Sequence, residues 1–336
     1  MNPKRIIISR TDSIGDVVLT FPMCYWLKDN FPETELIFLG KDYTKPVIEN
    51  CSSIDKFISW DEIQLLPSSE KIIFLRALQA DTIIHIFPNK EIASLAKKAK
   101  ITARIGTSHR IFHFLTCNYR IDFSRKKSDL HEAQLNFELL RPLGLKSIPS
   151  WEEINTSQHF WKVEKEDLPA EIQLIIDSSK KIVILHPKSQ GSAKEWPIEN
   201  YLALANLLVQ DGWNVIFTGT ENEGKLFRSK IPTNSAILDT TGKMSLNQLI
   251  YVISKSSALV ACSTGPLHIA GLCGIKAIGL YSSKRPIHPG RWKPLGKYAQ
   301  AVVFDPNCPL CAKRKECACI EKISVETIFN EIKKGA

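Results

Sequence analysis

The sequence of residues 258–270 is ALVACSTGPLHIA, and its character changes half-way along. The first five residues form an apolar run typical of a buried parallel strand. The small residues Ser263, Thr264 and Gly265, followed by a proline, are typical of a helix start. A strand that turns tightly into a helix presents free backbone N–H groups where α/β folds bind phosphate. The segment predicts an anion site, to which His268 would contribute from about one turn into the helix; an ordinary helix cap beside a buried histidine is the alternative.

The same alternation of strand and helix extends along most of the chain and predicts a parallel sheet in each half. Strands are expected at 4–9, 36–40, 56–59, 82–87, 103–106, 181–186, 214–217, 236–238, 258–262, 276–280 and 300–304. Helices are expected after residue 16, where Pro22 either kinks the helix or limits its first segment, and at 91–99, 128–143, 198–210, 223–229, 245–255 and 325–333. The fold class is therefore α/β, with two Rossmann-like doubly wound domains at 1–165 and 178–336. Packing of the last helix back on the N-terminal domain is an open alternative.

Length and composition are those of an ordinary globular protein. The chain has 336 residues, 44% of them hydrophobic and 24% charged, which suits two domains. No apolar run reaches the roughly 18–20 residues of a membrane span, and the first residues lack the pattern of a signal peptide. Most of the nine cysteines stand singly in apolar segments, which is typical of reduced thiols. We therefore expect a cytoplasmic protein.

The formal charge of +9 favours an anionic partner such as nucleic acid, an anionic membrane surface or a phosphorylated substrate. The lysines are dispersed and no nucleic-acid-binding motif is present, so a local site for an anionic substrate is the better interpretation. The chain also lacks G-x-G-x-x-G after its first strand and a P-loop, which argues against nicotinamide chemistry and P-loop hydrolysis.

Polar junctions follow several of the expected strands. In the first half, Gly15 and Asp16 stand at a helix start, where the carboxylate is either a partner of the helix dipole or a general base. In the second half, residues 186–197 carry Ser189 and Lys194, and a lysine there can stabilise a departing phosphate. Residues 217–223 and 239–245 form two further junctions at the same sheet edge, and Glu221 or Glu223 suits ribose hydroxyls.

Four cysteines lie close together near the C-terminus. Cys308 and Cys311 have the spacing of metal ligands, but only one residue separates Cys317 from Cys319. This pattern favours a reduced thiol cluster in a surface loop over a metal site.

Taken together, the junctions resemble the heptosyltransferases of glycosyltransferase family nine. The resemblance rests on residues 13–22 (SIGDVVLTFP), 186–187 with 194–197 (HP and KEWP), 242–246 (GKMSL) and 263–270 (STGPLHIA). It implies a GT-B architecture with a central cleft between an N-terminal acceptor domain and a C-terminal nucleotide-sugar domain. It also implies an inverting, metal-independent transfer of a heptose or related sugar from an ADP-activated donor to a lipopolysaccharide inner-core acceptor.

The resemblance also implies roles for individual residues. Asp16 would be the catalytic base, and Lys194 would steady the diphosphate leaving group. The donor would be bound by Ser189, Lys194, Glu223 at the ribose, Met244 against the adenine, Ser263, Thr264, Gly265 and His268. Candidates for the acceptor are Gly15, Arg104, Arg110 and His131, the last three because an anionic acceptor favours basic side chains. Members of the family often carry an acid where this chain has Ser263, which bears on the choice of donor.

The resemblance implies no bound metal and no cofactor. The expected partners are an ADP-sugar and a lipid A–inner-core oligosaccharide, without nucleic acid and with peripheral contact at the inner face of the inner membrane. Competing hypotheses are other sugar-nucleotide chemistry on the same fold, such as epimerisation, and a nucleotide-sugar-binding protein without turnover.

Overall fold

The computed structural model describes residues 2–125, 127–156 and 159–334, and it divides into two units, Met1–Lys162 and Val163–Ala336. Each unit contains one six-stranded sheet, and each sheet is parallel throughout. Within the described part of the chain, no helix combines the length and the apolar character needed to cross a membrane.

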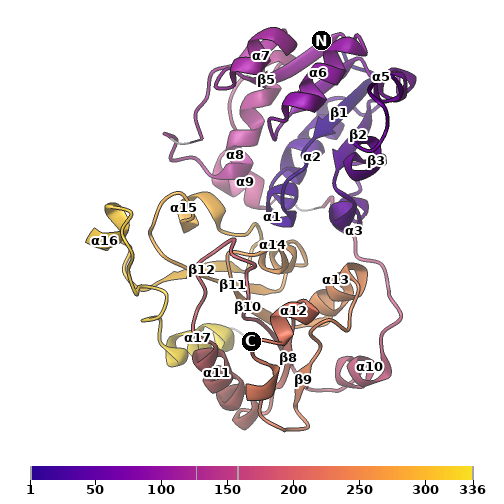
Figure 1. The fold of residues 1–336 in the computed structure, drawn as a ribbon. Helices are drawn as coiled ribbons and strands as arrows, with labels where there is room; N and C mark the ends of the chain where they lie inside the picture. Colours follow the sequence, from indigo (N-terminus) through magenta and orange to yellow (C-terminus); the bar gives the residue numbers. More distant parts are fainter. Residues whose placement is uncertain (1, 126, 157–158, 335–336) are drawn as a thin grey trace. The chain divides into compact units, whose positions relative to one another are not determined.

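The sheet of the N-terminal unit has the order β3-β2-β1-β4-β5-β6 (Figure 1). Its strands are β1 (Arg5–Ser9), β2 (Glu35–Gly40), β3 (Lys56–Ser59), β4 (Thr82–His85), β5 (Ala103–Thr107) and β6 (Tyr119–Ile121). The central strands are buried on both faces, as the apolar run Ile6, Ile7 and Ile8 requires. The order reverses between β1 and β4, which is the topological switch point of a doubly wound sheet.

The sheet of the C-terminal unit repeats this topology in the order β12-β11-β10-β7-β8-β9 (Figure 1). Its strands are β7 (Ile182–His186), β8 (Asn214–Phe217), β9 (Ile237–Asp239), β10 (Ala258–Cys262), β11 (Lys276–Tyr281) and β12 (Ala299–Val303). The switch point lies between β7 and β10, so the loops that follow these two neighbouring strands meet there. The expected α/β class with two doubly wound halves is confirmed.

Helices connect the strands in both units. Those of the N-terminal unit are α1 (Ile14–Val18), α2 (Phe21–Asn30), α3 (Lys45–Glu49), α4 (Trp60–Ile63), α5 (Ser68–Ala77), α6 (Lys90–Lys98), α7 (Ile111–Thr116), α8 (Glu132–Phe137) and α9 (Trp151–Thr156), with 3₁₀ turns at Asp42–Thr44 and Glu138–Leu143. Those of the C-terminal unit are α10 (Ala170–Ile176), α11 (Ile198–Gln210), α12 (Glu221–Gly224), α13 (Leu246–Lys255), α14 (Gly265–Leu272), α15 (Pro289–Trp292), α16 (Pro309–Ala312) and α17 (Val325–Lys333), with a 3₁₀ turn at Arg228–Lys230.

Several helix predictions were wrong in detail. The helix expected at 128–143 is α8 followed by a 3₁₀ turn that contains Pro142, because proline cannot donate the backbone bond of a continuing α-helix. The helix expected at 223–229 is instead α12, which ends at Gly224, followed by the 3₁₀ turn at Arg228–Lys230. Of the two effects expected of Pro22, the structure shows the shortened first segment, since α1 ends at Val18 and α2 starts at Phe21 with Pro22 in its first turn.

The final helix, α17, packs within its own unit. It lies against α11, and Ile328 and Ile332 are buried in the core that the β7–β8–β10 strands share (Figure 1). Contact of this helix with the N-terminal domain stays a prediction from the sequence.

Candidate active site

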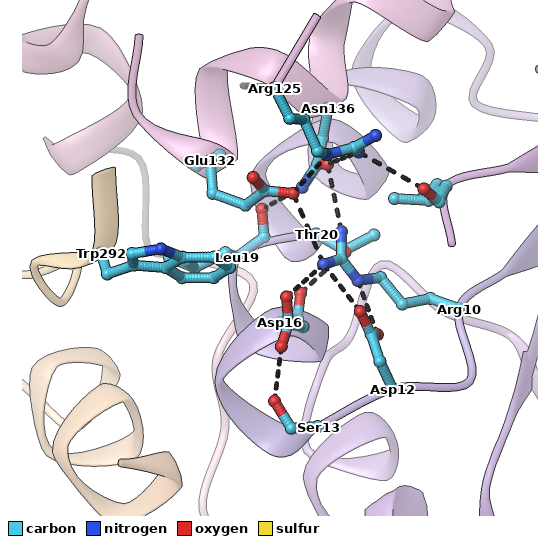
Figure 2. Close-up of polar contacts among 12 residues, drawn as sticks. Arg10, Asp12, Ser13, Asp16, Leu19, Thr20, Arg125, Glu132, Asn136 and Trp292 are labelled. Carbon is cyan, nitrogen blue, oxygen red and sulfur yellow. Dashed lines mark hydrogen bonds and ion pairs between the residues drawn. The ribbon is translucent and has the colours of Figure 1, made fainter. Parts of the chain in front are cut away.

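The N-terminal unit holds a buried guanidinium at the carboxyl end of β1, at the switch point of its sheet. Figure 2 shows Arg10 surrounded by acceptors from three parts of the chain. Its Nε and Nη2 donate to Asp12 at 2.9 and 3.1 Å, Nη2 also donates to Asp16 at 2.5 Å, and Nη1 donates to Asn136 at 3.1 Å. Burial opposes the charge of Arg10, but Asp12, Asp16 and Glu132 outweigh it and raise the Arg10 pKa further. The guanidinium is therefore permanently charged and fixed in place.

Asp16 stands in the first turn of α1, where a carboxylate is favoured by the helix dipole. One oxygen accepts from Arg10, and the other accepts from the Ser13 hydroxyl at 2.5 Å (Figure 2). The Thr20 hydroxyl donates to the Asp16 backbone carbonyl at 3.0 Å and ties the end of this turn. The Asp16 side chain is 18% exposed. It is thus held in one orientation and still reachable by a ligand.

The cluster contains two guanidinium groups and three carboxylates. Arg125 donates to Glu132 at 2.8 Å, and Glu132 also lies 3.5 Å from Arg10. With Asp12 and Asp16 the acids outnumber the guanidinium groups by one, so the cluster has a net negative charge when all are ionised. Burial raises the pKa of Asp12 to about 6, with Arg10 acting in the opposite direction. The partly exposed Asp16 carboxylate thus lies beside other charged groups in a fixed position, which is the geometry that a general base requires.

The other acceptor-side candidates have different surroundings. Gly15 is buried in α1 beside Asp16. The Arg104 guanidinium donates to the backbone carbonyls of Ile101, Thr102 and Thr116, which hold the segments flanking β5. These bonds give Arg104 a structural role, and the geometry adds no support to acceptor binding by it.

Arg110 and His131 both stand at helix starts. Arg110 is exposed at the N-cap of α7, after the carboxyl end of β5. His131 is buried at the N-cap of α8, where its Nδ1 accepts from the Ala133 N–H and its ring lies 4.5 Å from that of Trp151. Arg110 remains available to an anionic ligand, whereas His131 shapes the start of α8.

In the C-terminal unit, the four polar junctions lie at one edge of the sheet, as predicted. They follow β7, β8, β9 and β10, which are parallel neighbours. The hydroxyl of Thr264, the N-cap of α14, is buried and has no hydrogen-bond partner. His268 lies in the next turn and is 2% exposed. Its backbone N–H donates to the backbone carbonyl of Thr264. A buried hydroxyl beside unpaired N–H groups of a helix start is suited to ligand oxygens.

A cavity of about 300 Å³ opens beside this junction. Its lining includes Lys194, Ser263, Lys284 and Arg285, so three cations surround a small volume. The Lys194 ammonium pairs with Glu321 at 2.9 Å and also donates to the backbone carbonyl of Cys317. Burial opposes the charge, but Glu321 outweighs it and raises the Lys194 pKa. The cavity has the charge and the polar groups to bind a phosphorylated ligand.

Ser189 belongs to the loop after β7 and is engaged within it. The Glu195 carboxylate accepts from the Ser189 N–H at 2.9 Å, the Ser189 hydroxyl at 3.1 Å and the Lys188 ammonium at 2.7 Å. Burial acts against ionisation of Glu195, but Lys188 and Ser189 outweigh it and lower the Glu195 pKa. Glu195, which the sequence reasoning did not select, therefore sets the shape of the loop that carries Lys194.

Glu223 and Met244 lie in the two remaining junctions. One Glu223 oxygen accepts from the N–H and the hydroxyl of Thr220 at 2.7 and 2.9 Å, which closes a capping box at the start of α12. Met244 is half-buried between β9 and α13. The structure thus brings Lys194 and Ser263 to one cavity and leaves Ser189, Glu223 and Met244 in adjoining loops.

Sequence reasoning did not select Arg10, the ion-pair partner of Asp16, or the residues that surround Arg10. Arg10 and Asp12 stand in the same polar junction, and that proximity was a usable signal. Asn136, by contrast, is 126 residues from Arg10 along the chain, and Arg125 reaches the cluster from the segment before α8. No local pattern marks these two residues.

Two doubly wound units with polar strand ends define a protein of the GT-B class, and comparison with known proteins agrees. The E. coli ADP-heptose lps heptosyltransferase II has a similar structure, with a TM-score of 0.75, 17% identity and 98% of each chain covered. The E. coli heptosyltransferase WaaC with ADP gives a TM-score of 0.73 at 16% identity, covering 99% of this chain and 100% of that one. In sequence, the lipopolysaccharide core heptosyltransferase OpsX of Haemophilus influenzae is 26% identical, with 99% of this chain and 97% of that protein covered.

The profile of glycosyltransferase family 9 (heptosyltransferase) matches residues 74–321, well over half of the chain. The protein belongs to this family and is a glycosyltransferase.

Proposed function

We propose that this enzyme transfers a heptose, or a related sugar, from an ADP-activated donor to the inner core of lipopolysaccharide. The transfer inverts the anomeric centre and requires no metal ion for the chemistry. Family membership supports the reaction class, and the names of the related proteins support the donor and the acceptor. The observation that carries the proposal on this chain is the cationic cavity beside Ser263, next to the unpartnered hydroxyl of Thr264.

The chemistry requires a base and a stabilised leaving group. A sugar hydroxyl is a poor nucleophile, so Asp16 takes its proton as the oxygen bonds to the anomeric carbon. The bond from that carbon to the diphosphate breaks at the same time, and ADP leaves with the electron pair. Lys194 and the start of α14 stabilise the negative charge that develops on the diphosphate. Arg10 and Ser13 hold the Asp16 carboxylate in one orientation for this step.

The alternative is a nucleotide-sugar-binding GT-B protein that uses another donor sugar or lacks turnover. Ser263 favours this alternative, because it places a neutral hydroxyl in the cavity where related enzymes often carry an acid. Its presence there changes the hydrogen bonds offered to the donor and thus the sugar preferred.

The first experiment measures thermal stability with ADP, UDP, GDP, CMP or NAD, with added magnesium and without it. A ligand that binds the folded protein raises the melting temperature as its saturation rises. We expect stabilisation by ADP that does not depend on magnesium, followed by ADP release when ADP-heptose and heptose-deficient lipopolysaccharide are supplied together. Preference for another nucleotide would replace the donor, and binding without release of the nucleotide would favour the alternative.

Replacement of Asp16 tests the base. We expect Asp16→Ala to lower kcat by about 10²–10⁴-fold, the usual contribution of a general base, while the ADP-induced stabilisation stays near that of the unmodified enzyme. The matched control is Asp122→Ala, since the Asp122 side chain is 86% exposed in the same unit. Equal loss of nucleotide binding and turnover in the Asp16 variant would indicate a folding defect instead.

We also propose peripheral contact with the inner face of the inner membrane, where a lipid-linked acceptor would lie. The exposed face of α7 supports this: Ile111 is 88% exposed, Phe114 59% and Leu115 73%. The Arg120 guanidinium lies 5.3 Å from the Phe114 ring, which adds a cation for anionic headgroups. No amphipathic pattern marks this face in the sequence, because α7 has only six residues.

Vesicle sedimentation tests the membrane contact. The enzyme should bind vesicles that contain anionic lipid and dissociate as salt rises, because screening weakens the attraction of Arg110 and Arg120. A variant with Ile111→Ser and Leu115→Ser should bind several-fold more weakly and keep its activity on a soluble, delipidated acceptor. Unchanged vesicle binding by that variant would rule out α7 as the contact.

A further inference from the structure

The most concentrated set of metal-ligating side chains lies at Cys308, Cys311, Cys317 and Cys319. Their four sulfur atoms all lie within 4.8 Å of one another, and all four thiols are free. We propose that these thiolates hold a structural metal ion of the zinc or ferrous iron class in a tetrahedral site. The proposal replaces the reduced thiol cluster that the spacing of the cysteines favoured.

The distances suit a tetrahedron. Metal–sulfur bonds of about 2.3 Å place tetrahedral sulfur atoms about 3.8 Å apart. The sulfur atoms of Cys311 and Cys319 lie 3.9 Å apart, and those of Cys311 and Cys317 lie 3.0 Å apart. Small side-chain rotations about Cys317 would complete the tetrahedron. The single residue between Cys317 and Cys319, which argued against a site in the sequence, does not prevent the two thiols from facing the same centre.

Burial and local composition also require a stabilising element here. Cys308, Cys311 and Cys319 are buried at 7%, 1% and 5% exposure, and the small apolar cluster at this place consists of the four cysteines. The one helix of the segment, α16, has four residues. A short segment without an apolar core of its own is typically fixed by a metal or a disulfide.

The charge around the cluster agrees with four thiolates. A divalent ion with four thiolates carries a net charge of −2, and Lys313, Arg314 and Lys315 are exposed on the loop between the two cysteine pairs. An all-sulfur ligand set selects a soft or borderline ion and discriminates against magnesium and calcium.

The site bears on the donor cavity through Lys194. The backbone carbonyl of Cys317 accepts from the Lys194 ammonium, and Glu321, four residues further, pairs with the same ammonium. Ile320 lines the cavity, and the Trp196 indole donates to the Ile323 carbonyl at 3.0 Å. Metal binding would therefore fix the backbone at Cys317 and Glu321, and these two residues hold the Lys194 ammonium. This second step rests on the proposed function, whereas the metal site does not.

Elemental analysis of the purified full-length enzyme tests the site. We expect about one zinc or iron per chain, and the analysis itself distinguishes the two. Reduced, metal-free enzyme should bind one cobalt(II) ion and give the visible absorption of tetrahedral thiolate coordination. Cys308→Ser and Cys319→Ser should each lose the metal, while Cys117→Ser, in the N-terminal unit, should retain it. If the Ser variants fail to fold, the metal content and the cobalt spectrum of the unmodified enzyme still decide the question.

Absence of metal, together with no tetrahedral cobalt spectrum, would overturn the proposal, as would a disulfide between any two of these cysteines. The positioning step has a separate readout. Metal-free enzyme should bind ADP at least about fivefold more weakly, because Lys194 loses its anchor. Unchanged ADP affinity would refute the positioning of Lys194 and leave the metal site standing. An enzyme that binds metal but no ADP at all would refute the proposed function alone.

Discussion

Asp12 and Asp16 both accept from the Arg10 guanidinium, so the charge of Asp12 changes the surroundings of Asp16, the proposed base. Below about pH 6, Asp12 becomes protonated, because burial raises its pKa to about 6. The cluster around Asp16 then has one negative charge fewer. We therefore predict that kcat falls as the pH decreases through 6, and that Asp12→Asn fixes the low-pH state. That variant should have a kcat about three- to tenfold lower at pH 7.5 and no inflection near pH 6.

The pH profile of kcat for both proteins, measured at saturating donor and acceptor, checks this prediction. Asp122→Asn serves as the control, because its exposed carboxylate lies outside the cluster. An inflection near pH 6 that persists in Asp12→Asn would assign the titration to another group and separate Asp12 from the base.

At the scale of elements, the helix that carries Thr264 and His268 depends on a close backbone approach. A Cβ added to Gly271 in α14 would lie 1.9 Å from the carbonyl oxygen of Leu295. We predict that Gly271→Ala displaces α14, since neither backbone can yield without moving the helix. The expected cost is about 1–3 kcal/mol, or a melting temperature lower by several degrees, with loss of the stabilisation by ADP. Thermal unfolding with and without ADP measures both effects.

Gly290→Ala provides the comparison, because only the flexible ring of His288 lies near its added Cβ. This variant should unfold close to the unmodified protein. If Gly271→Ala keeps its melting temperature and its ADP response, the start of α14 is not fixed by this contact.

Elements could be predicted from the sequence where a short, continuous stretch of residues carries their pattern. The runs that form β1, β7 and β10 are continuous and apolar, so the strands and the junctions that follow them were predicted from the sequence. The helix α5 (Ser68–Ala77) was missed, because only Lys71 and Leu75 are buried and the apolar face is weak. The cluster around Arg10 was predicted only in part for the same reason. Asp16 has a local signal in the sequence, whereas Asn136 comes close to Arg10 only in the folded chain. The convergence of the four thiols likewise depends on the turn between the cysteine pairs.

For the whole molecule, acid stability depends on a histidine buried in the N-terminal unit. His85, in β4, has both ring nitrogens buried without a hydrogen-bond partner, and its ring lies 5.6 Å from that of His113. Burial, with the neighbouring charge of His113, lowers the His85 pKa to about 3. The folded state therefore keeps this ring neutral, whereas the unfolded chain binds a proton below about pH 6.5. Protons thus favour unfolding across the interval between these two values.

We predict that the free energy of unfolding falls by about 1.4 kcal/mol for each pH unit below 6.5 on account of His85 alone. His85→Leu should remove this part of the slope, whatever it does to the stability at neutral pH. Urea unfolding followed at several pH values between 7 and 5 measures the slope. ADP should leave it unchanged, because the cavity proposed to bind ADP belongs to the C-terminal unit. Equal slopes for His85→Leu and the unmodified protein would place the acid sensitivity elsewhere, and the ring pair of His85 and His113 would then matter for packing alone.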